Sequence, residues 1–477
     1  MVRASFCCGS NLNRDPIIVH LIQFSFFYLA RHSNHWKKQN VPYETLSLIL
    51  RPLYRTLIKP VYLPDQERYQ KYGRLSGFFE AAKPSLIVAE PELVKQVLVK
   101  DFNLLPNRME IDFGDSVVNN MMVMAHVERW RKIRPACTPA FTTGKLRKMH
   151  HLIAGCVTVT CNHLEAAAEN SNDADMKQVY GHYALDVIAR CAFGTIVDSH
   201  TDTASQFVIA SQKALGMGFS PLQILSMLFP GLLKSLRIKE KTAAPFMYFK
   251  RLFLQIMDER KQKNKRAEDF LQLMIEAKEG RFTATNENST DVESQLFNVG
   301  SEVHGEVKKL NALTEDEALA QCVVFFLAGQ DTTSSTLAAA AYYLALNPDV
   351  QEKLRTEADE CFATHGPEPS LDTISKLNYL HCVVSETLRM LPPVPRFSEE
   401  NVGSIQPYTY LPFGAGPRNC IGMRLALLSI KLCLLRSVYR VQFVRTEDTK
   451  VPLLIKEGRG TLKVEGTVVG LQRRPSS

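Results

Sequence analysis

The stretch Phe413-Gly414-Ala415-Gly416-Pro417-Arg418-Asn419-Cys420-Ile421-Gly422 places one thiol in a glycine-rich loop. An apolar run from Met423 to about Tyr439 follows it and predicts a helix that begins just after the thiol. Free backbone N–H groups and the helix dipole at such a start favour a thiolate over a thiol. The glycines allow the backbone to turn sharply and to approach a flat ligand closely. Arg418 can supply a cation for a carboxylate. A thiolate, a cation and a backbone that can approach closely are together suited to binding haem iron.

The loop matches the pattern Phe-x-x-Gly-x-Arg-x-Cys-x-Gly and resembles the haem loop of cytochromes P450. The resemblance implies haem b with the Cys420 thiolate as the axial iron ligand. It also implies that four further loop residues surround the cofactor, namely Phe413, Gly416, Arg418 and Gly422. The alternative is a buried structural cysteine in a glycine-rich turn. Such a turn would not need all ten residues of this stretch to fit the pattern.

A long helix is predicted from Thr314-Glu315-Asp316-Glu317, which forms a capping box, to Asn347-Pro348. It spans about 32 residues and roughly 48 Å at 1.5 Å per residue. Its residues are apolar on nearly all sides, which predicts a helix buried in a large core. Asn347 is expected to cap the next helix, with Pro348 at its first position.

Ala328-Gly329-Gln330-Asp331-Thr332-Thr333 lies inside this helix. A glycine there is expected to open room for a small ligand, and hydroxyls can bond back to the preceding turn. An acid followed by a hydroxyl is suited to proton delivery. The segment resembles the oxygen-activation segment of cytochromes P450, which implies catalytic roles for Asp331 and Thr332 and cofactor contacts for Ala328 and Gly329. The alternative is a helix with a packed glycine and a polar patch.

Two further pairs carry the same resemblance. Trp130 and Arg134 present an indole N–H and a guanidinium four positions apart, which suits one haem carboxylate and resembles the C helix of the family. Glu386 and Arg389, three apart on one helical face, resemble a K-helix ion pair that supports the haem loop, and we expect that pair to be buried. An exposed pair of little energetic value is the alternative.

The chain has 57 Lys and Arg against 49 Asp and Glu, a net charge of +8 that is too dispersed for a nucleic-acid stripe. A membrane surface or an acidic protein partner fits better, with ordinary solvated helix faces as the alternative. The basic residues near the site motifs in sequence are Arg129, Arg131, Lys132, Lys145, Arg147, Lys148, Arg424, Lys431, Arg436 and Arg440. The 11 cysteines lack zinc-type spacing, so most are expected to be reduced structural thiols.

Residues 17–30 are apolar with a basic flank, so residues 1–42 are predicted to be a membrane anchor and 43–477 the haem domain. Because the run is shorter than a usual spanning helix, a buried or interfacial helix is the alternative. Within the haem domain, residues 279–313 are polar and predict a surface loop.

The likeness extends from about Pro42 to the C-terminus, and the chain resembles the microsomal clan of family-three drug and steroid monooxygenases and thromboxane synthase. It implies a mainly α fold with a minor β part. It further implies insertion of one oxygen atom from O2 into an apolar steroid, lipid or xenobiotic, with electrons from NADPH–cytochrome P450 reductase and cytochrome b5 as a further partner. The expected location is the endoplasmic reticulum membrane, with the catalytic domain facing the cytosol. A haem-thiolate isomerase is the alternative, against which Asp331 and Thr332 count.

One departure from the family is large. Cys420 follows Glu386 by only 34 positions, whereas the family has several dozen more residues, which belong between Arg396 and Phe397. We therefore expect an incomplete main sheet and a weaker haem protein, and a non-catalytic truncated product is a further alternative. Arg396 is expected either to complete the Glu386–Arg389 pair or to contact haem.

Overall fold

The computed structural model describes most of the chain. The described residues are 32–45, 62–80, 83–108, 116–170, 172–216, 220–222, 225, 243–264, 266–281, 312–392, 407–456 and 463–474. The predicted apolar run at 17–30, most of the predicted loop at 279–313 and the expected gap at Arg396–Phe397 lie outside these residues.

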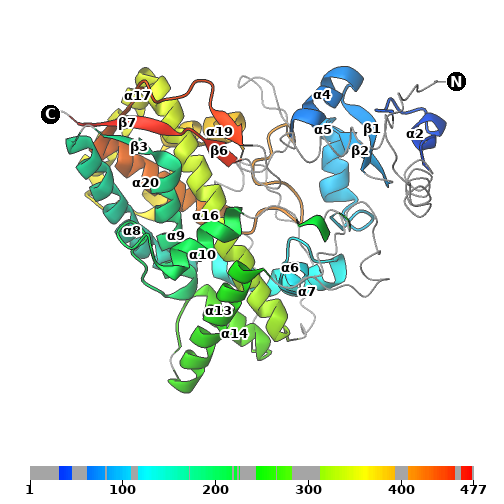
Figure 1. Cartoon of the computed structure of the whole chain (residues 1–477), viewed down its shortest axis with the longest axis horizontal. Helices are drawn as coiled ribbons and strands as arrows, with labels where there is room; N and C mark the ends of the chain where they lie inside the picture. The colour runs from blue at the N-terminus through cyan, green and yellow to red at the C-terminus, as the bar shows by residue number, and fades with distance from the viewer. Residues whose placement is uncertain are drawn as a thin grey trace, which may run out of the picture.

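The centre of the fold is helix α16 (Glu315–Leu346), which is 32 residues long and is buried along most of its length. Its start has both hydrogen bonds of a capping box: Glu317 N–H donates to Thr314 Oγ1 (3.2 Å) and Thr314 N–H donates to Glu317 Oε2 (2.9 Å). Figure 1 shows α16 running through the middle of the helical part of the molecule. The predicted long central helix is therefore confirmed.

Helices pack around α16 and form two large apolar clusters, one toward each end of it. In Figure 1, α8, α9, α17 and α20 lie on one side, and α13 and α14 lie at one end. The longer surrounding helices are α7 (Val127–Cys137), α8 (Thr143–Glu169), α9 (Met176–Phe193), α10 (Gln206–Gly216), α13 (Ala244–Gln262), α14 (Phe270–Lys278), α17 (Pro348–His365), α19 (Asn378–Met390) and α20 (Met423–Arg440). The other helices are α2 (His35–Lys38), α4 (Tyr62–Tyr72), α5 (Pro91–Lys95), α6 (Ser116–Asn120), α18 (Leu371–Ser375) and the 3₁₀ turn η2 (Thr138–Phe141).

Two helix ends follow the sequence signals and one departs from them. Helix α9 ends at Gly194, whose φ of 60° is left-handed, and α17 begins with Pro348 at its first position. Asn347 is the N-cap residue of α17, as expected, but its side chain makes no capping hydrogen bond. Its Nδ2 donates instead to the carbonyl of Tyr343 in the preceding turn.

Short antiparallel sheets complete the described fold. Strands β1 (Leu75–Glu80) and β2 (Lys83–Val88) form one pair, and β5 (Leu454–Lys456) and β6 (Lys463–Glu465) form another. The third sheet has the order β3-β7-β4, from β3 (Asp173–Asp175), β7 (Val468–Arg473) and β4 (Val441–Val444). The prediction of a mainly α fold with a minor β part is confirmed.

The helix that begins at Pro91 changes type part-way. It is α-helical to Lys95 and continues as a π-helix, η1 (Gln96–Lys100). Insertions of this kind are rare and often lie at functional sites. None of the helices in the described ranges is both long and apolar enough to cross a bilayer.

Candidate haem site

Cys420 lies in a tight loop directly before α20. Its N–H donates to the carbonyl of Phe413 (2.8 Å), which closes the loop, and its side chain is exposed. Gly416 has a φ of 69°, and a Cβ there would lie 1.9 Å from the carbonyl oxygen of Leu98 in η1. Only glycine permits this contact, so the loop is pressed against the π-helix. Gly422 is the N-cap residue of α20, as the predicted helix start requires.

Helix α7 and the loop itself each supply one cation near Cys420. Arg134 donates through both terminal nitrogens to Asn419, to its carbonyl (2.8 Å) and to its Oδ1 (2.7 Å). Arg418 donates to the carbonyls of Pro106 (2.8 Å) and Ala125 (3.1 Å). Its guanidinium also lies 4.8 Å from the ring centre of Trp130, which is buried. Four predicted site residues, Trp130, Arg134, Arg418 and Cys420, are thus brought together.

Among the described residues, no acid forms an ion pair with either guanidinium. Arg134 and Arg418 donate instead to the neutral oxygens named above. Burial lowers the pKa of Arg134 to about 10, an effect that Cys420 partly opposes. Burial also lowers the pKa of Arg418 to about 10, and repulsion from Arg108 and Arg134 adds to it. A bound anion would relieve this repulsion.

Helix α16 opens one short face in an otherwise buried element. Ala328 is exposed and Thr332 is half-buried, four positions apart on the same face. Thr332 Oγ1 donates to the carbonyl of Ala328 (2.8 Å), the predicted back-bond. The expectation that Gly329 opens room for a ligand is wrong. A Cβ at Gly329 would lie 2.5 Å from Ile188 Cδ1, so the glycine serves the close packing of α9 against α16.

Asp331 points away from Thr332, toward α9. The amine of Lys177 lies 2.9 Å from Asp331 Oδ1 and also donates to the Asp331 carbonyl (3.1 Å). The same amine donates to Ser334 Oγ (2.8 Å) and Ser335 Oγ (2.6 Å). The side chain of Asp331 is only 9% exposed, against 24% for that of Lys177. The acid and the hydroxyl therefore do not form a contacting pair here.

Glu386 and Arg389 on α19 form a two-bond ion pair, with both nitrogen–oxygen distances at 2.7 Å. The arginine holds the pKa of Glu386 below its usual value. The expectation of a buried pair is wrong, because the Glu386 side chain is 50% exposed and that of Arg389 is 28% exposed. One link from α19 toward the loop is neutral: the Tyr410 hydroxyl donates to the Ser385 carbonyl (2.8 Å). Arg396 lies outside the described residues.

The chain matches the family model for cytochrome P450 over residues 59–397 and 394–467. The chain belongs to the cytochrome P450 family. It is 31% identical to cytochrome P450 3A41 of Mus musculus over 96% of both chains, and 33% identical to cytochrome P450 3A7 of Homo sapiens over 93% of both. It is also 33% identical to cytochrome P450 3A2 of Rattus norvegicus over 82% of both. The family resemblance predicted from the motifs is therefore confirmed.

Membership makes this P450 a haem-thiolate monooxygenase that works with a redox partner on a small molecule. The donor set fits that cofactor. An exposed thiol at a helix start suits an iron ligand, and two guanidiniums without anionic partners suit the propionates. The exposed face at Ala328 and Thr332 leaves α16 open to a ligand.

Three contacts of the site were not predicted from the sequence. Asn419 accepts both bonds from Arg134, and its place beside Cys420 was the only available signal. Arg108 donates to the Arg418 carbonyl (3.2 Å), and Lys177 binds Asp331. Both of these bring together distant parts of the chain, and no local pattern marks them.

The basic residues near the motifs in sequence lie in different environments in the fold. Lys431 is fully buried and cannot belong to a partner surface. Lys132 is paired with Glu317 (2.8 Å), and Arg440 with Glu165 (2.9 Å). The hypothesis that all of these basic residues form one docking surface for a partner is therefore wrong.

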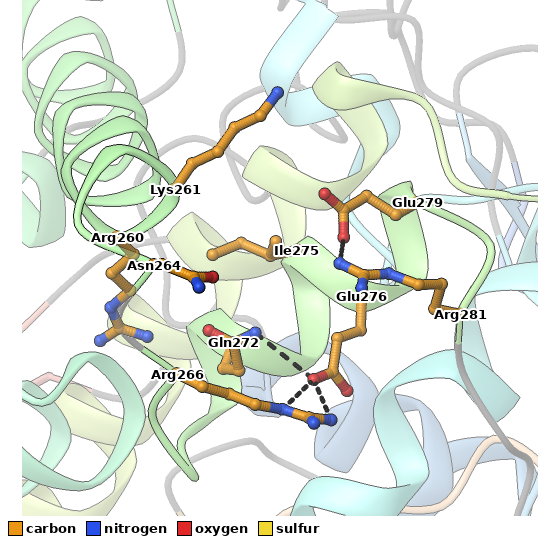
Figure 2. Close-up of a pocket in the computed structure, with 9 residues that line it drawn as sticks. All are labelled: Arg260, Lys261, Asn264, Arg266, Gln272, Ile275, Glu276, Glu279 and Arg281. Carbon is orange, nitrogen blue, oxygen red and sulfur yellow. Dashed lines mark hydrogen bonds and ion pairs between the residues drawn. The ribbon is translucent and has the colours of Figure 1, made fainter.

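A polar hollow of about 530 Å³ lies elsewhere, at the end of α13 and along α14 (Figure 2). Its arginines are engaged with neighbouring acids, as Figure 2 shows for Arg266 with Glu276 and Arg281 with Glu279. It includes none of the predicted site residues, so it is separate from the haem site.

We expect Lys177→Met to destabilise this P450, because the Asp331 carboxylate then stays buried without its cation. Breaking a buried pair costs about 3–5 kcal/mol, and the partial exposure of Lys177 places the loss near ~3 kcal/mol. Thermal unfolding of Lys177→Met, Asp331→Asn and the double variant measures the coupling. The double variant should be more stable than the sum of the single losses predicts, and simple additivity would contradict the pair.

Proposed function

We propose that this P450 inserts one oxygen atom from O2 into an apolar small molecule of the steroid, lipid or xenobiotic class. The observation that carries the proposal is the exposed Cys420 thiol beside Arg134 and Arg418, two cations whose charge no described acid neutralises. Haem, when bound, supplies the activation of O2. Cys420 would hold its iron, and the two arginines with Trp130 would hold its carboxylates.

The apolar substrate class is supported by the residues around Thr332. In the two turns of α16 before it, the positions that stay at least partly exposed are Phe325, Leu327, Ala328 and Gly329, and none of them has a polar side chain. Such a face gains free energy by excluding water from an apolar ligand. Thr332 would hold a proton at this face, and Asp331 would exchange protons with solvent through the partly exposed Lys177.

We propose further that residues 1–42 anchor the chain to the endoplasmic reticulum membrane, that residues 43–477 form the haem domain, and that the domain faces the cytosol. NADPH–cytochrome P450 reductase would be the electron donor, with cytochrome b5 as a second partner. The net charge of +8 supports attraction to an anionic membrane surface and to acidic partners.

A non-catalytic product is the second candidate, and two observations favour it. The family model matches in two stretches that meet at residues 394–397, which is where the family's further residues are expected to be absent. Strands β1 and β2 form a sheet of only two strands among the described residues. Isolated two-stranded pairs are marginal, so this end of the fold has weak support.

Replacing the thiol tests the iron ligand. Cys420→Ala should remove the thiolate-type Soret band of the reduced carbon monoxide complex, because no sulfur remains in the loop. Cys382→Ala, at another exposed cysteine, is the matched control and should keep that band. A Cys420→Ala protein with an unchanged band would assign the iron to another ligand.

Replacing the hydroxyl tests proton delivery. Thr332→Ala should lower product formed per reductant by about tenfold or more and raise peroxide release, since a positioned proton donor contributes roughly 10²–10⁴-fold. Thr332→Ser keeps the hydroxyl and should stay close to the parent chain. If Thr332→Ala keeps full coupling, Thr332 has no part in the reaction, and turnover without reductant would instead identify an isomerase.

The sequence gap can be tested by insertion. A relative's segment placed between Arg396 and Phe397 should raise haem content and melting temperature, because it would add strands to the open sheet. A glycine–serine linker of equal length is the control and should raise neither. Equal haem content and melting temperature with and without the relative's segment would show that the gap is tolerated, and the non-catalytic candidate would lose its support.

A further inference from the structure

Among the residues that the structure describes, one edge of the β1–β2 pair has no strand partner. On the β1 side, Gly77 N–H donates to the Pro42 carbonyl (2.8 Å) and its own carbonyl accepts from Glu44 N–H (2.9 Å). Gly77 therefore directs its backbone groups away from β2. Gly77 lies opposite Leu86 in the antiparallel ladder, and these two residues do not form backbone hydrogen bonds with each other. Leu86 in turn directs its N–H and carbonyl outward, away from β1.

The same holds two positions along the strand in each direction, because the bonding pattern repeats every second residue. Pro84 and Val88 also face outward, opposite Phe79 and Leu75. The outer edge of β2 thus offers the N–H groups of Leu86 and Val88 and three carbonyls, since proline has no N–H. Within the described ranges, β2 has no strand neighbour other than β1.

This edge is also accessible and apolar. The Leu86 residue is 42% exposed, whereas Ile87 on the opposite face is only 8% exposed. Lys83 is the only charged residue of the strand. Open edges with few charges are templates for pairing with another extended strand.

We propose that the outer edge of β2 is a self-association surface, which pairs antiparallel with β2 of a second copy of this chain. The pairing places Leu86 opposite Leu86 of the second copy on a two-fold axis. Each Leu86 N–H then donates to the opposite Leu86 carbonyl, and each Val88 N–H donates to the opposite Pro84 carbonyl. Every N–H donor of the edge is used.

The strand favours its own copy over an unrelated strand for two reasons. In this register Pro84 of one copy, which has no N–H, lies opposite Val88 of the other copy. The Val88 N–H still donates to the Pro84 carbonyl, so no N–H donor is left unpaired. Lys83 falls opposite Ala89, so like charges are not opposed, and the Leu86 side chains meet each other across the axis. A register that places Leu86 opposite Pro84 overlaps as many strand residues, but Val88 then has no strand residue opposite it and its N–H finds no acceptor within β2. Larger shifts overlap fewer strand residues.

The interface is small, because one short strand from each copy falls well below the roughly 1,200–2,000 Å² of a stable complex. We therefore expect a dimer whose fraction rises with protein concentration. Analytical ultracentrifugation of the full chain in non-ionic detergent should show this rise. Leu86→Pro should abolish it, since the lost N–H is not part of the β1–β2 ladder, whereas Leu86→Ala keeps the N–H and should retain a dimer. A parent chain that is monomeric at all concentrations overturns the proposal.

A disulfide tests the register and does not depend on the proline variant folding. Paired Cα atoms at a mutually bonded position lie about 5.5 Å apart, within the range of about 4.4–6.8 Å that a disulfide spans. Leu86→Cys should give several-fold more oxidised dimer than the parent chain, whose exposed Cys382 and Cys420 set the background. Leu104→Cys, at a leucine that is 78% exposed and not in β2, is the control. Equal cross-linking in the two cysteine variants overturns the proposal.

Discussion

Burial of one long helix is the constraint on which the rest of this P450 depends. Helix α16 is covered on almost every side, so the helices around it must each supply an apolar face. Its polar side chains then need partners inside the protein, since an unpaired buried polar group is costly. Gln321 accepts from Met122 N–H (2.9 Å) and donates to the Asn120 carbonyl (2.8 Å), which fixes α6 against α16. Lys177 does the same for α9 through Asp331. Ala328, exposed in the middle of this helix, and the half-buried Thr332 stand out against this background.

The loop before α20 depends on different chemistry. Its shape comes from backbone bonds and from the contact of Gly416 with Leu98, whereas its positive charge comes from Arg134 of α7 and from Arg418 of the loop itself. Arg134 and Arg418 tolerate burial by bonding neutral oxygens, which leaves their charge available to a bound anion. The thiol therefore lies in a rigid loop next to positively charged side chains. Rigidity and nearby positive charge are the two properties that an iron-bound thiolate requires.

Much of this arrangement could be predicted from local sequence. The capping box, the length of α16, the turn at Gly194 and the loop before α20 all follow from signals within a few residues. The pairings across the fold could not be predicted in this way. The Lys177–Asp331 pair joins residues 154 positions apart, and the packing of Ile188 against Gly329 depends on how two helices cross. The exposure of Glu386 and Arg389 likewise depends on what covers α19, which the i,i+3 spacing does not encode.

The contact between Arg134 and Asn419 also has a consequence for synthesis of the chain. Its two residues are 285 positions apart, so α7 leaves the ribosome long before the loop that receives its guanidinium. At about 5–20 residues per second, the delay is roughly 15–60 s. Throughout that interval the nascent chain carries Arg134 and Trp130 but neither Arg418 nor the thiol. Haem capture is therefore confined to the final part of translation or to the released chain, and helices completed earlier must remain soluble until then.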